Sequence, residues 1–178
     1  GSPNYAMRAL ESVQNQDLYD LQIVVVCRDV APGVRHSLEV AAGRDIHIDL
    51  IDVEDSTRGA CVNAGFAASR GSQIVAMNAD EWFAPQSLSK MVEVACDVAA
   101  DIVIPTVSVD RYDAHRDRHS RVLDATPLAI DDRASLAAGL SQMISGGLIA
   151  QTCGVVYSRS LFEACLSRGC AFRSIGFM

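Results

Sequence analysis

Short apolar runs alternate with helical patterns along the first 107 residues, and this alternation constrains the fold more than any other feature. Four runs predict strands because they have strand length and apolar or alternating patterns: residues 21–27, 46–53, 72–78 and 101–107. The helical patterns cover residues 6–16, 35–42, 60–70 and 85–100, with Gly71 expected as a C-cap and Pro85 as a helix opener. The order predicts an α/β layered domain with a mostly parallel sheet.

The remainder of the chain has a different pattern. Residues 110–124 are polar and alternate in charge sign, which predicts a solvated excursion or a hairpin on the surface. His115 and His119 flank Asp117 there, but no helical pattern fixes them on one face, so a loop is favoured over a metal site. A helix over 131–145, a strand over 154–158 and a helix capped by Ser158 and followed by Gly169 complete the prediction.

Composition narrows the class of function. The net charge of −7 argues against general nucleic-acid binding, which requires a basic surface, although a small anionic ligand is still compatible. No apolar run approaches the roughly 20 residues of a spanning helix. Six cysteines form no CxxC pair, so we expect buried free thiols and a cytoplasmic protein, with the inner face of the membrane as an alternative site.

Two acids, Asp80 and Glu81, follow the third predicted strand directly. Carboxylates at the mouth of a buried strand are costly unless they are solvated, paired or bound to a cation. Ligands of parallel sheets bind beyond the carboxyl ends of the strands, so the residues after Val26 and Met77 are the candidates for a site. The alternative for Asp80 is an acid that favours the start of the next helix.

Three blocks of the sequence together resemble family 2 glycosyltransferases. The first is RALESVQNQDLYDLQIVVV, the second GACVNAGFAASRGSQIVAMNADEWFAPQSLSKMV and the third GVVYSRSLFEACLSRGCAFRSIGFM. The resemblance covers nearly the whole chain, and it implies a GT-A fold, which is a Rossmann-like three-layer domain. It also implies a nucleotide-sugar donor, a divalent cation (Mg²⁺ or Mn²⁺) and transfer of the sugar to an acceptor hydroxyl, usually with inversion.

The resemblance also implies roles for individual residues. Asp80 matches the acid that binds the metal, and Glu81 stands where a further Asp is usual. The implied nucleotide-sugar-binding positions are Cys27, Asp29, Asn63, Asn78 and Asp80.

Several of these positions depart from the family pattern. Cys27 and Arg28 replace two acids; Asp29 can serve if the loop shifts by two residues, and Arg28 either contacts a phosphate or faces solvent. Val62 replaces the arginine before Asn63, and Asn78 replaces an acid, so it can bind a ribose hydroxyl but brings no charge to a metal. The acidic pair that supplies the catalytic base would follow Met178, so the catalytic residue is left unnamed.

We therefore expect one domain over residues 1–178, shortened at both ends, that acts as a glycosyltransferase in glycan or cell-surface polysaccharide synthesis. Its acceptor would be a glycan or a lipid-linked molecule. The alternative is a non-catalytic GT-A-like nucleotide-binding or scaffold domain, motivated by the missing acids at Cys27, Arg28 and Asn78. A dehydrogenase or nucleotidyltransferase is disfavoured, because no glycine-rich GxGxxG turn follows Cys27.

Overall fold

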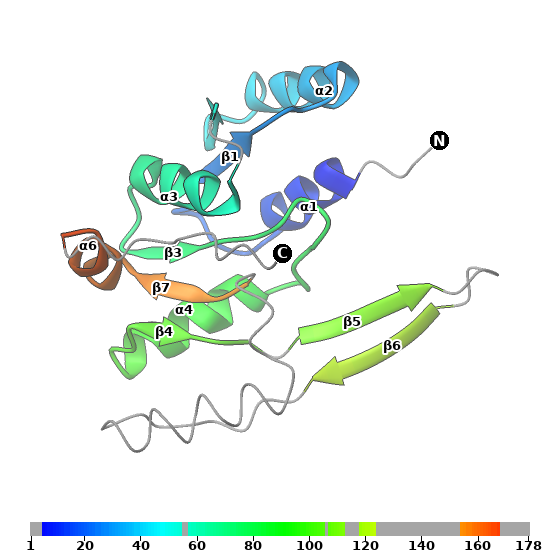
Figure 1. The fold of residues 1–178 in the computed structure, drawn as a ribbon. Helices are drawn as coiled ribbons and strands as arrows, with labels where there is room; N and C mark the ends of the chain where they lie inside the picture. The colour runs from blue at the N-terminus through cyan, green and yellow to red at the C-terminus, as the bar shows by residue number, and fades with distance from the viewer. Residues whose placement is uncertain (1–4, 55–56, 106, 113–117, 124–153, 168–178) are drawn as a thin grey trace.

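The computed structural model describes residues 5–54, 57–105, 107–112, 118–123 and 154–167. Strands and helices alternate along the first part of the chain, as Figure 1 shows. In chain order the elements are α1 (Tyr5–Gln14), β1 (Ile23–Cys27), α2 (Pro32–Ala42), β2 (Ile48–Asp52), α3 (Arg58–Ala68), β3 (Gln73–Val75), α4 (Ser87–Asp97), β4 (Ile102–Val103), β5 (Val107–Tyr112), β6 (Arg118–Leu123), β7 (Val156–Ser158) and α6 (Arg159–Ser167). The α/β prediction is confirmed.

Strands β1 and β2 form the parallel pair that the sequence predicts. Their register places Ile23 opposite Ile48 and Cys27 opposite Asp52, so the two carboxyl ends meet at one edge. Helices α1 and α2 pack on this pair through a cluster of buried side chains. Its members are Leu10, Cys27, Leu38 and Ile48. Helix α3 packs closely on β1 at Gly65, where an added Cβ would lie 3.1 Å from the Val26 side chain.

The remaining core surrounds a second sheet in the strand order β3–β7–β4. Strand β7 runs antiparallel to both neighbours, so β3 and β4 point the same way. Helix α4 packs on this sheet through Leu88, Met91 and Ala95, which surround the fully buried Val156. Phe66 of α3 and Phe162 of α6 meet edge to face, with 5.0 Å between ring centroids, and join the two helices beside β3.

Most predicted helix ends differ from the observed ones by one to three residues, and three of the differences are instructive. Helix α2 begins at Pro32, whose fixed φ suits a first turn, rather than at residue 35. Helix α3 ends at Ala68, and the extended Ser69 takes the C-cap place that we expected at Gly71. Pro85 lies before α4 rather than inside it; the N-cap is Gln86, which has a φ of 60°.

The single strand predicted over residues 101–107 is two strands. Only Ile102 and Val103 pair with β7, and β5 begins at Val107. Pro105 lies between them, and a proline cannot donate a ladder hydrogen bond, which accounts for the break. Strands β5 and β6 pair antiparallel, so the hairpin expected within residues 110–124 is confirmed, with His119 opposite Arg111. His115 and Asp117 lie outside the described residues.

Helix α6 begins as the sequence predicts. The Ser158 hydroxyl accepts a hydrogen bond from the Leu161 backbone N–H at 3.2 Å, which confirms Ser158 as its N-cap. Gly169 and the helix predicted over 131–145 lie outside the described residues.

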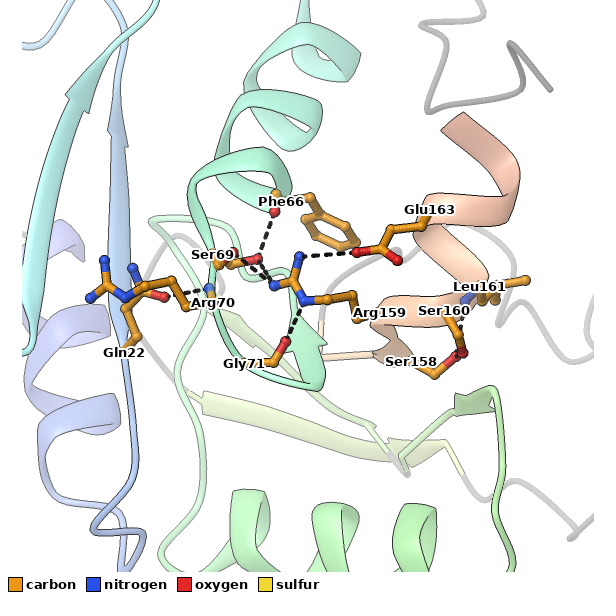
Figure 2. Close-up of polar contacts among 10 residues, drawn as sticks. All are labelled: Gln22, Phe66, Ser69, Arg70, Gly71, Ser158, Arg159, Ser160, Leu161 and Glu163. Carbon is orange, nitrogen blue, oxygen red and sulfur yellow. Dashed lines mark hydrogen bonds and ion pairs between the residues drawn. The ribbon is translucent and has the colours of Figure 1, made fainter. Parts of the chain in front are cut away.

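Arg159 fastens the start of α6 to the loop between α3 and β3, as Figure 2 shows. Its Nε donates to the Gly71 carbonyl at 2.8 Å, and its Nη2 donates to the carbonyl and hydroxyl oxygens of Ser69 at 2.7 and 3.0 Å. This side chain therefore holds together two segments that lie about half the chain apart in sequence.

The cysteine prediction was correct only in part. Where the structure describes them, Cys27, Cys61, Cys96 and Cys165 are free thiols, but Cys27 alone is buried and Cys96 is exposed. Cys153 and Cys170 lie outside the described residues. Within the described ranges, no helix has both the length and the apolar character that crossing a bilayer requires.

Candidate functional site

A tight turn after β3 carries Asp80. The Glu81 backbone N–H donates to the Asn78 carbonyl at 3.2 Å, which closes the turn. The Glu81 carboxylate then folds back and accepts from the Asn78 backbone N–H at 3.4 Å and from its Nδ2 at 3.2 Å. The turn is therefore held by main-chain and side-chain bonds between the residues on either side of Ala79 and Asp80.

Arg58, at the start of α3, fixes the same turn from a neighbouring element. Its Nη2 donates to the Asn78 Oδ1 at 2.7 Å. The helix end that presents Arg58 is itself capped, because the Thr57 hydroxyl accepts from the Ala60 backbone N–H at 3.3 Å. Asn78 thus donates to Glu81 and accepts from Arg58. An aspartate in its place could accept from Arg58, but its ionised carboxylate could not donate to Glu81.

Asp80 lies at the tip of this turn with an exposed side chain. No described residue pairs with its carboxylate or donates a hydrogen bond to it. The carboxylate is solvated and open to a ligand from solution, which is one of the three conditions that make an acid tolerable at a strand mouth. Glu81 differs from Asp80, because its carboxylate oxygens accept hydrogen bonds from Asn78 within the turn.

The donor set at Asp80 fits a hard cation only in part. Among the residues that the structure describes, no group of three or more His, Cys, Asp or Glu side chains could hold a metal ion. Mg²⁺ commonly binds one or two carboxylates and takes its other ligands from phosphates and water. Among the described residues, the Asp80 carboxylate could therefore serve as a single protein ligand of such a cation.

Cys27, at the end of β1, is part of the core rather than of an open surface. It is 3% exposed and packs with Leu10, Leu38 and Ile48. Burial raises the pKa of the Cys27 thiol, while the nearby Arg35 charge opposes this rise. The raised pKa favours the protonated thiol, which packs in the core at the carboxyl edge of the first sheet.

Sequence reasoning missed an ion-pair cluster beside Cys27. Arg35 of α2 binds the Asp52 carboxylate through both terminal nitrogens and binds Glu39 through Nε at 2.8 Å. These hydrogen bonds, first that to Asp52 and then that to Glu39, raise the pKa of the Arg35 guanidinium. The i,i+4 spacing of Arg35 and Glu39 was the available signal, and Asp52 ends β2 as Cys27 ends β1.

The other expected site residues occupy separate places. Asp29 is exposed and has a φ of 48°, in the left-handed region that aspartate tolerates better than most residues. Arg28 beside it is exposed, and Asn63 is half-buried on α3. The Cys27 thiol contacts the Val25 carbonyl and the Arg35 side chain, and no contact with Asp80 is among them. Of the expected set, Asn78 and Asp80 lie together on one turn.

A comparison with protein families finds a match over most of the chain. The model of glycosyl transferase family 2 matches residues 2–164. Two bacterial relatives are also similar to the chain. "Putative glycosyltransferase EpsH" of Bacillus subtilis (strain 168) is 28% identical over 118 residues, which are 66% of this chain and 34% of that protein. "Uncharacterized glycosyltransferase alr2836" of Nostoc sp. (strain PCC 7120 / SAG 25.82 / UTEX 2576) is 26% identical over 160 residues, which are 89% of this chain and 48% of that protein.

The matched part of each relative is thus less than half of its length. The family match, in contrast, covers most of this chain, from the segment before α1 into α6. The chain therefore belongs to glycosyl transferase family 2 and has the GT-A fold that this family implies.

Proposed function

We propose that the chain is the donor-binding part of a glycosyltransferase that transfers a sugar from a nucleotide sugar to an acceptor hydroxyl, with inversion. Membership of family 2 supports a transferase. The observation that carries the proposal is the exposed carboxylate of Asp80, with which no described residue pairs, on a turn held by Asn78, Glu81 and Arg58. A fixed and solvated acid at the end of a strand suits a ligand that brings its own cation.

Asp80 would hold Mg²⁺ or Mn²⁺ in this proposal. The cation, when bound, neutralises the charge that develops on the diphosphate as the bond to the sugar breaks. The residues of the turn orient Asp80, because the bonds of Asn78 and Glu81 restrict the backbone on either side of it. Asp29 and Asn63 remain proposed contacts of the nucleotide, and Cys27 remains one only through its backbone, because its thiol is buried in the core.

Only the family membership supports the acceptor and the pathway that we propose. We propose a glycan or a lipid-linked acceptor, a role in cell-surface polysaccharide synthesis, and a cytoplasmic location or one at the inner face of the membrane. An inverting transfer needs a base within hydrogen-bond reach of the acceptor hydroxyl. We assign that base to no described residue.

A second candidate is a GT-A domain that binds a nucleotide without transferring a sugar. The observation in its favour is that two positions expected to carry acids are committed elsewhere. Asn78 is engaged by Arg58 and Glu81, and Cys27 is buried in the core. Both candidates predict nucleotide binding, so transfer is what separates them.

Titration calorimetry with UDP and GDP, with and without Mn²⁺, tests the first proposal. For the wild-type chain we expect Mn²⁺ to tighten nucleotide binding at least about tenfold, because one carboxylate and the diphosphate share the cation. Asp80→Asn should abolish this gain, whereas Asp97→Asn, a matched change of an exposed acid on α4, should keep it. A wild-type chain that binds neither nucleotide, or an Asp80→Asn chain that responds to Mn²⁺ like wild type, would refute it.

The second candidate is tested on the full-length protein. Release of UDP from UDP-glucose, or of GDP from GDP-mannose, is measured with Mn²⁺ present. Release that depends on Asp80 supports transfer, since water can replace the missing acceptor. Metal-dependent binding without release of either nucleotide would favour the binding domain.

A further inference from the structure

Helix α1 presents three polar side chains to the segment that follows Asp80. Arg8, Ser12 and the adjoining Gln16 are spaced four residues apart, so they share one face of the helix and its last turn. We call these three residues the α1 stripe. Each contacts a different point of residues 82–88, about 70 positions further along the chain.

The first two contacts fix the residues directly after Glu81. The Arg8 guanidinium carbon lies 3.6 Å from the centroid of the Trp82 ring, which is a cation–π geometry. The Ser12 hydroxyl accepts from the Phe83 backbone N–H at 3.1 Å and donates to the Ala9 carbonyl of its own helix at 2.7 Å. The hydroxyl proton is thus directed into α1, which leaves the oxygen free to accept from the loop.

Gln16 makes the third contact with both ends of its amide. Nε2 donates to the Ala84 carbonyl at 3.0 Å and to the Ser12 carbonyl at 2.9 Å, and Oε1 accepts from the Leu88 backbone N–H at 3.1 Å. Leu88 is in the first turn of α4, where N–H groups lack a partner within the helix. The N-cap residue of α4, Gln86, makes no side-chain capping bond, so Gln16 supplies that bond from another helix.

Asp80 therefore lies between two sets of bonds. On its N-terminal side, Arg58 holds Asn78, and on its C-terminal side the α1 stripe holds residues 82–88. The Asp80 side chain itself takes no part in either set and stays exposed. Together these bonds fix the backbone on both sides of Asp80, and they leave the oxygens of the Asp80 carboxylate free of these contacts.

We propose that the α1 stripe is a positioning element for Asp80, which tunes binding of the cation and diphosphate without touching either. This inference rests on the proposed function of Asp80. Residues that orient a metal ligand commonly change metal affinity by 10–100-fold when they are removed. A stripe that served stability alone would change the unfolding midpoint and leave the affinity of the folded chain unaltered.

The test measures the dissociation constant of Mn²⁺ in the presence of UDP, and of GDP, for folded chains held well below their melting temperatures. We expect Ser12→Ala and Gln16→Ala each to weaken Mn²⁺ binding about tenfold. Ser12→Thr keeps the hydroxyl acceptor and should bind as wild type does. Gln14→Ala is the matched control, because its amide comes from the same helix but donates to Asp45, far from the loop in sequence.

The outcomes separate the two claims. If Ser12→Ala and Gln16→Ala lower the melting temperature yet bind Mn²⁺ like Gln14→Ala, the positioning role is wrong while the function of Asp80 stands. If wild type and Asp80→Asn are indistinguishable, the proposed function fails first. Should Gln16→Ala fail to fold, Arg8→Gln decides the matter, because Arg8 is exposed and, among the described residues, contacts Trp82 alone through its side chain. Unchanged affinity in Arg8→Gln would then overturn the inference.

Discussion

The side-chain amide of Asn78 donates a hydrogen bond to the carboxylate of Glu81 across 3.2 Å. Family 2 sequences typically carry an acid at the position of Asn78, which here would place two carboxylates in contact. The amide removes that repulsion and adds a donor, while its oxygen still accepts from Arg58. The amide at residue 78 thus contacts the glutamate at residue 81, and we expect the two side chains to be energetically coupled.

Restoring the acid should therefore destabilise the turn. We expect Asn78→Asp to lower the free energy of unfolding by about 1 kcal/mol, because a hydrogen bond is replaced by a contact between like charges. Adding Glu81→Gln should recover most of this loss, since a neutral amide can donate to the new carboxylate. Urea denaturation of the single and double variants measures the coupling. Additive effects would show that the two side chains do not interact in solution.

Two glycines should respond in opposite ways to the same change. Gly154 has a φ of 75°, and its N–H donates to the Ala76 carbonyl at 2.8 Å, which joins the start of β7 to the end of β3. Gly154→Ala should cost about 1–2 kcal/mol of stability, because L-residues are strained in the left-handed region. Gly33→Ala should gain about 0.5–1 kcal/mol, because Gly33 is helical with nothing within 4 Å of an added Cβ. Thermal unfolding of both variants checks the signs, and a loss at both sites would contradict the argument.

The sequence predicted the order of elements well because local pattern dominates it. The β-branched run that ends at Cys27 and the alternation that ends at Val53 both predicted strands, and the two strands pair in parallel. Helix ends were less predictable. Nothing local marks Gln86 as a left-handed N-cap. The residues on either side of it, Ala84 and Leu88, are held by Gln16, about 70 residues earlier in the chain.

Only those residues of the candidate site that belong to a local sequence motif could be predicted from the sequence. Asp80 was predicted as a site residue from its place after a strand and from the family pattern, and the structure leaves its carboxylate exposed. The partners that hold its turn were not found. Arg58 precedes Asn78 by 20 residues, and no periodicity links a helix start to a distant turn. The Arg35–Asp52 pair was missed for the same reason, because it depends on how α2 lies against β2.

The carboxylate of Asp45 makes stability depend on acid pH. Hydrogen bonds from the Gln14 amide, and then from the His47 backbone N–H, hold the pKa of Asp45 below its ordinary value. A lowered folded-state pKa contributes stability above the unfolded pKa, and this contribution is lost as the pH falls through the folded value, below about 4. Asp45→Asn should therefore be less stable than wild type at pH 7, with a difference that closes on acidification. Urea midpoints from pH 7 to pH 2 measure it, and a constant difference would contradict the linkage.

The hydrogen bonds from Arg159 to Gly71 and Ser69 should contribute more to stability than the ion pair between Arg159 and Glu163. Arg159→Lys keeps the charge but loses the planar group that donates to Gly71 and Ser69 at once (Figure 2), so we expect a loss of about 1–2 kcal/mol. Glu163→Gln removes the 4.0 Å ion pair with Arg159, which is the contact of Glu163 among the described side chains, and should cost less than about 0.5 kcal/mol. Urea denaturation compares the two variants. Equal losses would mean that charge, rather than the geometry of the guanidinium, holds α6 to the loop between α3 and β3.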